Sequence, residues 1–286
     1  MTTAVLFPGQ GSQRKGMGKE LFGRYPDAER QAEDILGYSV PELCLEDPGG
    51  RLGDTVYTQP VRYVVNALAW RAAAEEGLTG DVLLGHSVGE YAALLAAGVF
   101  DFATGLRLVA RRASAMAGVP GGMSVVLGLE AGQISEVLRS AGLSAIDLAN
   151  LNAVDQIVIA GPADALDAAV GPLTSAGAFR VRKLDVSGPF HSRYMRGTAR
   201  VFARAVHDLR FAPPSIPVIS NRTAAEYPDT GIARLLIEQI DHQVRWADSL
   251  AYVLRRDPDA TFVELGGTPT LGGTVRRALR QVGRAS

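Results

Sequence analysis

A serine lies at the centre of a strand, turn and helix pattern. Residues 82–84 read Val-Leu-Leu, a short apolar run typical of a buried strand, and residues 85–89 read Gly-His-Ser-Val-Gly. We expect a helix to follow over residues 90–97. Small residues on either side permit a sharp turn that presents a serine hydroxyl at the edge of a sheet. The pattern favours an α/β protein with Ser87 as a nucleophile. A glycine-rich turn with a capping serine is the alternative.

Composition and charge exclude several classes of protein. The chain has 286 residues, 47% of them hydrophobic, so it can bury a large core. The formal net charge of −1 provides no basic field for nucleic acid. Cys44 is the sole cysteine, which excludes an internal disulfide. The four histidines have no spacing typical of metal ligands, so we expect no metal site.

Hydropathy gives no sign of a membrane segment. No apolar run reaches the roughly 18 residues that a membrane span requires. The N-terminal residues carry no basic segment ahead of their short apolar stretch, unlike a secretory signal. We therefore expect a cytoplasmic protein that binds neither membranes nor nucleic acid, and we expect a monomer.

The order of elements predicts two domains. Residues 121–186 follow the pattern βαββαβ, which is typical of a small ferredoxin-like unit. Its expected strands are 123–129, 145–149, 156–160 and 178–186, and its expected helices are 131–141 and 163–176. We expect it to be inserted into a large α/β-hydrolase-like domain with a mostly parallel sheet, formed by residues 1–120 and 187–286. The expected strands of that domain are 4–7, 82–84, 216–220 and 261–265, and its further helices are 61–76, 102–117, 195–209, 232–240 and 271–280.

A serine nucleophile needs a base, because a free hydroxyl is almost un-ionised at neutral pH. His86 adjoins Ser87, but a neighbour on the same turn cannot readily aim its ring at that hydroxyl. His191 follows the last expected strand of the small unit, and catalytic side chains often lie in such loops. His207 and His242 are typical of surface residues. A structural role for His191 is the alternative.

One arginine lies at the edge of a buried helix face. Helical spacing over residues 102–117 places Arg107 and Arg111 toward solvent and Arg112 beside the apolar face. An arginine at that boundary can point into a cleft while its stem packs on apolar neighbours. A structural ion pair is the alternative role.

Several motifs in order carry a family resemblance. They are residues 7–13 (Phe-Pro-Gly-Gln-Gly-Ser-Gln), 58–60 (Thr-Gln-Pro), 85–90 (Gly-His-Ser-Val-Gly-Glu), the helix with Arg112, 150–152 (Asn-Leu-Asn) and 189–192 (Pro-Phe-His-Ser). The chain resembles the malonyl-CoA:acyl-carrier-protein transacylases and the related acyltransferases of polyketide assembly over nearly its whole length.

The resemblance implies roles for the catalytic residues. Ser87 would be the acylated nucleophile, and His191 would act as general base and acid. A backbone carbonyl near residues 242–244 would orient the histidine in place of a carboxylate. The N–H groups of Gln10 and Val88 would form the oxyanion hole.

The resemblance also implies a substrate pocket. Arg112 would pair with the free carboxylate of a malonyl group, a task suited to its planar fork of donors. Phe190 would favour malonyl over methylmalonyl by filling the space of an α-methyl branch. Gln59 and Asn150 would line the pocket. His86 would contact the substrate or support the turn.

The function implied is transfer of malonyl from malonyl-CoA to the phosphopantetheine thiol of an acyl carrier protein, with no permanently bound cofactor. Residues 35–39, 42–48 and 63–68 are most similar to freestanding polyketide acyltransferases. A housekeeping fatty-acid transacylase, a hydrolase that clears acyl chains from carrier proteins, and a non-enzymatic docking module are the alternatives. Arg276, Arg277 and Arg280 are candidates for contacting an acidic carrier protein.

Overall fold

A parallel sheet forms the centre of the larger unit. The computed structural model describes residues 1–267 and 269–285 and contains, within them, two sheets of four strands each. The first sheet has the strand order β7-β2-β1-β8, with all neighbours parallel. Its strands are β1 (Thr3–Phe7), β2 (Val82–Gly85), β7 (Val218–Ile219) and β8 (Thr261–Glu264).

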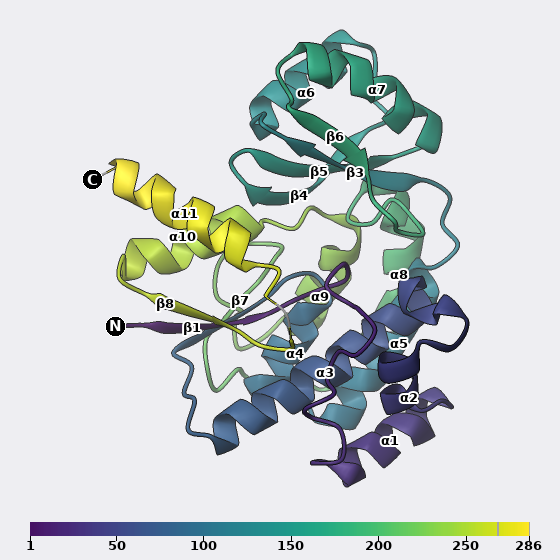
Figure 1. Ribbon diagram of the computed structural model, residues 1–286, viewed down its shortest axis with the longest axis vertical. Coiled ribbons are helices and arrows are strands. Elements are labelled where there is room, and N and C mark those ends of the chain that lie inside the picture. The colour runs from purple at the N-terminus through teal and green to yellow at the C-terminus, as the bar shows by residue number, and fades with distance from the viewer. Residues whose placement is uncertain (268, 286) are drawn as a thin grey trace.

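Helices cover both faces of this sheet, as parallel strands require. Val5 and Leu83 pack into the core on the side of α3 (Thr55–Glu75) and α4 (Gly89–Ala96). Leu6 and Leu84 point the other way, toward α10 (Trp246–Arg256) and α11 (Gly272–Ala285). Figure 1 shows these two layers on either side of β1. Successive side chains of each strand point to opposite faces of the sheet, and both faces are buried. This is why the sequence of each strand is a continuous apolar run.

The other helices of the larger unit lie on the side of α3. They are α1 (Pro26–Leu36), α2 (Val40–Glu46), α5 (Phe102–Met116), α8 (Arg196–Val206), α9 (Ile232–Asp241) and the short 3-10 helices η1 (Pro48–Gly53) and η2 (Arg193–Met195). None of the helices among the described residues has the length and apolarity needed to cross a bilayer.

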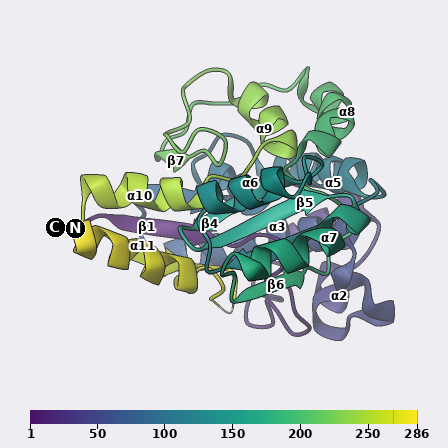
Figure 2. The ribbon, with the colours of Figure 1, turned by 90° about the horizontal axis from the view of Figure 1, so that it is seen from above.

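The second sheet is antiparallel and belongs to a smaller unit, at the top of Figure 1. Its elements run β3 (Gly122–Leu127), α6 (Ala131–Ser140), β4 (Asp147–Ala153), β5 (Gln156–Gly161), α7 (Ala163–Ser175) and β6 (Arg180–Lys183). The strand order is β4-β5-β3-β6, and α6 and α7 lie side by side on its outer face (Figure 2). This arrangement confirms the expected ferredoxin-like fold inserted in an α/β unit. The limits 121–186 remain our proposal for the insert. Thr268 and Ser286, which we assigned to the larger domain, lie outside the described residues.

The small unit is joined to the large one by backbone hydrogen bonds. The segment after α9 pairs with β4: the Leu151 N–H donates to the Val244 carbonyl at 2.9 Å, and the Val244 N–H donates to the Ala149 carbonyl at 2.8 Å. The inner face of the small sheet, including Met123 and Val158, packs into the same core as α3 and α4.

Some expected boundaries were wrong. Helix α3 begins at Thr55 rather than at residue 61, because the Asp54 side chain caps it by accepting from the Val56 N–H at 3.0 Å. Pro60 therefore lies inside the helix, where it has no N–H to donate, and burial of most of the helix outweighs that loss. Helices α1, α2 and α10 were not predicted.

The close approach of β1 and α4 gives a test of the fold. A Cβ at Gly89 would lie 2.1 Å from the Phe7 carbonyl oxygen, so Gly89→Ala must push α4 away from the sheet. We expect the free energy of unfolding to fall by about 3 kcal/mol. Denaturant melts should show no such loss for Gly132→Ala, a helical glycine with open space around it. Equal effects of the two changes would contradict this account.

Candidate active site

Ser87 lies on a strained turn between β2 and α4. Its φ angle is +52°, in the left-handed region that non-glycine residues rarely occupy. A Cβ at Gly85 would come within 2.1 Å of the Glu90 nitrogen, so glycine is required there as it is at Gly89. The two glycines therefore let the chain turn sharply enough to expose the serine.

The side chain of Asn221 holds this turn. Its Oδ1 accepts from the Ser87 N–H at 2.7 Å, and its Nδ2 donates to the Gly85 carbonyl at 2.7 Å. Its own N–H donates to Glu90 Oε2 at 2.6 Å. Asn221 was not among the residues predicted for the site. Its position two residues after the parallel strand β7, at the carboxyl edge of the sheet, was the available signal.

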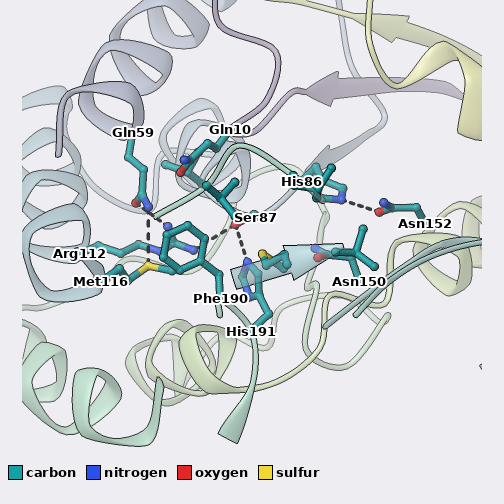
Figure 3. A pocket seen from close by; sticks show the side chains of 15 residues that line it. Gln10, Gln59, His86, Ser87, Arg112, Met116, Asn150, Asn152, Phe190 and His191 are labelled. Carbon is teal, nitrogen blue, oxygen red and sulfur yellow. Dashed lines mark hydrogen bonds between the residues drawn. The ribbon is translucent and has the colours of Figure 1, made fainter. Parts of the chain in front are cut away.

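His191 reaches Ser87 from a loop 104 residues later in the chain. The Ser87 Oγ lies 2.7 Å from the His191 Nε2, and the His191 Nδ1 lies 2.8 Å from the Gln239 carbonyl oxygen. A carbonyl only accepts, so Nδ1 carries the proton and Nε2 presents its lone pair to the serine. Figure 3 shows the ring directed at the hydroxyl.

The orienting carbonyl is not where we expected it. It belongs to Gln239, in the last turn of α9, rather than to residues 242–244. The last carbonyls of a helix have no partner within the helix, which leaves this one free for His191. Val244 instead pairs with β4.

Burial keeps the His191 imidazole neutral. It lowers the pKa of His191 from the ordinary 6.5 to about 3, and the nearby charge of Arg112 acts in the same direction. The hydrogen bond to the Gln239 carbonyl and the nearby backbone of His242 raise the pKa, but they only partly oppose this shift. The ring is thus able to accept a proton at neutral pH.

Arg112 lies on α5, and its side chain is fully buried beside the serine. Its Nη2 donates to the Ser87 Oγ at 3.1 Å and to the Gln239 Oε1 at 3.0 Å, and its Nη1 donates to the Gln59 Oε1. It forms no ion pair with any carboxylate of the described residues. Burial lowers the pKa of Arg112, against smaller opposing effects of Tyr91 and Glu90. A buried cation with neutral partners alone is an unusual and costly arrangement.

These groups surround a cavity of about 140 Å³ between the two units. All nine residues predicted for the site line it: Gln10, Gln59, His86, Ser87, Val88, Arg112, Asn150, Phe190 and His191. Asn152, which belongs to the motif at residues 150–152, lines the cavity too. Five further lining residues were not predicted for the site: Met116, Met123, Val158, Leu184 and Val186. Most of these are apolar and come from the inner face of the small sheet or the segment after it. They make the far wall of the cavity hydrophobic.

Two backbone donors at the cavity lack partners. Within the described residues, neither the Val88 N–H nor the Gln10 N–H donates a hydrogen bond. Val88 directly precedes α4, where the helix dipole favours negative charge. The Gln10 loop is held by a hydrogen bond of 3.1 Å from its Nε2 to the Thr55 Oγ1.

The remaining predicted residues differ in their surroundings. His86 points away from Ser87, and its Nε2 lies 2.8 Å from the Asn152 Oδ1 (Figure 3). The His86 ring packs edge-on against Trp246. Phe190 is buried directly before His191. His207 and His242 lie away from the cavity, and His242 contacts Asp241.

Comparisons with known proteins agree on one family. A family model described as an acyl transferase domain matches residues 5–286. The polyketide biosynthesis protein ThaF of Burkholderia thailandensis is 46% identical over 285 residues, 99% of this chain and 25% of ThaF. The polyketide biosynthesis malonyl CoA-acyl carrier protein transacylase PksC of Bacillus subtilis is 43% identical over 275 residues, 95% of each chain. A crystal structure of a malonyl CoA-acyl carrier protein transacylase from Burkholderia pseudomallei matches with a TM-score of 0.94 at 44% identity, covering 98% of this chain and 99% of that one. The chain thus spans about a quarter of ThaF and nearly all of the other two.

The low pKa of His191 predicts how Ser87 reactivity depends on pH. A protonated imidazole cannot take the serine proton, and a lowered pKa moves that loss to lower pH. Labelling of Ser87 by a fluorophosphonate, which attacks activated serines, should keep its rate from pH 8 down to about pH 5. An unperturbed histidine would halve the rate near pH 6.5. Intact mass measures the labelling, and His191→Ala should abolish it.

Proposed function

Since the chain belongs to the acyl transferase domain family, we propose that it moves a malonyl group from malonyl-CoA to the phosphopantetheine thiol of an acyl carrier protein. One observation carries this proposal. The Arg112 guanidinium, buried without a carboxylate partner, lies 3.1 Å from a serine Oγ that is itself 2.7 Å from a neutral imidazole. A nucleophile and an anion-binding group thus share one cavity.

In the first half of the proposed reaction, His191 Nε2 takes the proton from Ser87 as Oγ attacks the thioester carbonyl of malonyl-CoA. The N–H groups of Val88 and Gln10 hold the negative charge that develops on the carbonyl oxygen. The carbon–sulfur bond then breaks. The departing thiolate of coenzyme A takes the proton from His191, which leaves a malonyl ester on Ser87.

In the second half, the thiol of the carrier protein gives its proton to His191 and attacks the ester carbonyl. The ester carbon–oxygen bond breaks, and Ser87 recovers its proton from His191. Both halves use the same base and the same two N–H donors, so the free enzyme is regenerated without a cofactor.

Arg112 would hold the free carboxylate of the malonyl group through both halves. Two parallel charge-assisted hydrogen bonds match the guanidinium fork to a carboxylate. The cation is already desolvated, so an anionic acyl group supplies the counter-charge that the protein lacks. An acetyl group would leave the cation uncompensated, and this difference would favour malonyl.

Phe190 would limit the size of the acyl group. Its buried ring lines the cavity and would occupy the space of an α-methyl branch. One methyl group accounts for about 1–3 kcal/mol of discrimination, so methylmalonyl would be a poor substrate rather than an excluded one.

We propose that the carrier protein belongs to polyketide assembly, as the names of ThaF and PksC support. A housekeeping fatty-acid transacylase is the nearest alternative. Arg276 and Arg280 are exposed and remain candidates for carrier contacts, whereas Arg277 pairs with Asp155 at 3.2 Å. We further propose a cytoplasmic monomer with no nucleic-acid or membrane partner. A hydrolase would release free malonate from the Ser87 ester as fast as it transfers malonyl, and Arg112 favours the transferase.

Replacement of the nucleophile tests the acyl-enzyme. With Ser87→Ala no hydroxyl is present to form the ester, so we expect the malonyl adduct of 1:1 stoichiometry to disappear from the intact mass after incubation with malonyl-CoA. Ser114→Ala, which removes an exposed serine of α5, should leave the adduct unchanged. A malonyl adduct that persists in Ser87→Ala would refute the assignment.

Replacement of Arg112 tests the carboxylate anchor. Loss of a buried charge partner costs about 2–5 kcal/mol, so Arg112→Ala should slow acylation by malonyl-CoA about 100-fold. Acylation by acetyl-CoA, which has no carboxylate to bind, should slow far less. The exposed neighbour provides the control, since Arg111→Ala should keep the wild-type ratio of the two rates. An unchanged malonyl-to-acetyl ratio in Arg112→Ala would remove the anchor role.

A further inference from the structure

Gln239 contacts three residues of the site with three different atoms. Its carbonyl oxygen lies 2.8 Å from the His191 Nδ1. Its side-chain Oε1 accepts from the Arg112 Nη2 at 3.0 Å, and its Nε2 donates to the Ser87 carbonyl at 3.0 Å. The backbone contact is open to any residue type, whereas the two side-chain contacts depend on glutamine.

The chemistry of the two partners requires an amide at this position. A guanidinium only donates hydrogen bonds and a backbone carbonyl only accepts them, so the side chain must offer one acceptor and one donor. A glutamate would turn an acceptor toward the Ser87 carbonyl, and a methionine would satisfy neither partner. Gln239 is 1% exposed, so water cannot replace either bond.

The same amide leaves the charge of Arg112 uncompensated. Gln59 and Gln239 place neutral oxygens on the two ends of the guanidinium, where a protein would ordinarily place a carboxylate. The nearby carboxyl of Glu90 has other partners: it accepts from the Asn221 N–H at 2.6 Å and from the Tyr227 hydroxyl, and the Gln239 side chain also lies beside it. The two amide oxygens thus orient the Arg112 guanidinium without neutralising its charge.

We propose that the Gln239 side chain is a positioning residue that aims the Arg112 guanidinium at Ser87 while leaving its charge available, and so sets the preference for acyl groups that bear a carboxylate. This inference rests on the proposed malonyl transfer. A neutral amide oxygen yields to an incoming malonyl carboxylate at small electrostatic cost. A carboxylate at position 239 would instead remain paired with Arg112 and compete with the substrate.

Two substitutions and one control test the inference. Gln239→Glu supplies a competing carboxylate, Gln239→Met removes both side-chain contacts at similar volume, and Glu238→Gln changes the adjacent residue, which pairs at the surface with Arg234 at 2.8 Å. For each variant and the wild type, intact mass follows the initial rate of Ser87 acylation by malonyl-CoA and by acetyl-CoA. Thermal unfolding checks that each variant is folded.

We expect the malonyl-to-acetyl rate ratio to fall about 100-fold in Gln239→Glu and about tenfold in Gln239→Met, and to stay at the wild-type value in Glu238→Gln. A merely structural role would slow both substrates equally and keep the ratio. A wild-type ratio in folded Gln239→Met overturns the inference, even where Gln239→Glu fails to fold. Failure of the wild type to form a malonyl ester would instead overturn the proposed function.

Discussion

The backbone strain at Ser87 is the constraint on which the site depends. A serine at a φ of +52° is unfavourable alone, and it persists only because surrounding contacts fix it. Gly89 admits the tight approach of β1 to α4, and Gly85 admits the close approach of the start of α4. Asn221 binds the Gly85 carbonyl and the Ser87 N–H within the turn. The N–H of Asn221 donates to the side chain of Glu90, which lies in the first helical turn of α4. The strained residue, the strand before it and the helix after it therefore form one hydrogen-bonded unit.

Electrostatics in the cavity are arranged around a single positive charge. Arg112 and His191 both lie against Ser87, and two cations so close together would repel each other. Burial and the charge of Arg112 keep His191 neutral, so the two groups take different roles: one accepts protons and the other attracts anions. The pKa of Glu90 rises from 4.5 to about 7 because it too is buried, which limits the negative charge close to Arg112.

Local patterns in the sequence were sufficient for the parts of the site that depend on local structure. The run before Ser87 and the glycines around it predict a strand, a turn and a helix, and these form. Asn221 and Gln239 were missed because their importance arises from contacts 134 and 127 residues away along the chain. The helical spacing of Gln239 nevertheless marks it as unusual. It lies seven residues after Ile232, on the buried face of α9, where an apolar residue would be expected. The start of α3 was misjudged because Pro60 is a strong local signal that tertiary packing overrides.

The backbone pairing of Val244 with β4 has a mechanical consequence. Between the carbonyl that orients His191 and the N–H of Arg245, which donates to the Asn221 carbonyl at 2.9 Å, the chain has only a few residues. Within that span it also forms the ladder to the small sheet. This short segment, residues 239–245, is the tether that links three features of the site. The position of the imidazole, the support of the serine turn and the placement of the inserted unit therefore depend geometrically on one another. Deleting one residue from the tether would shift all three together, which makes its length as much a requirement of the active site as the identity of any side chain in it.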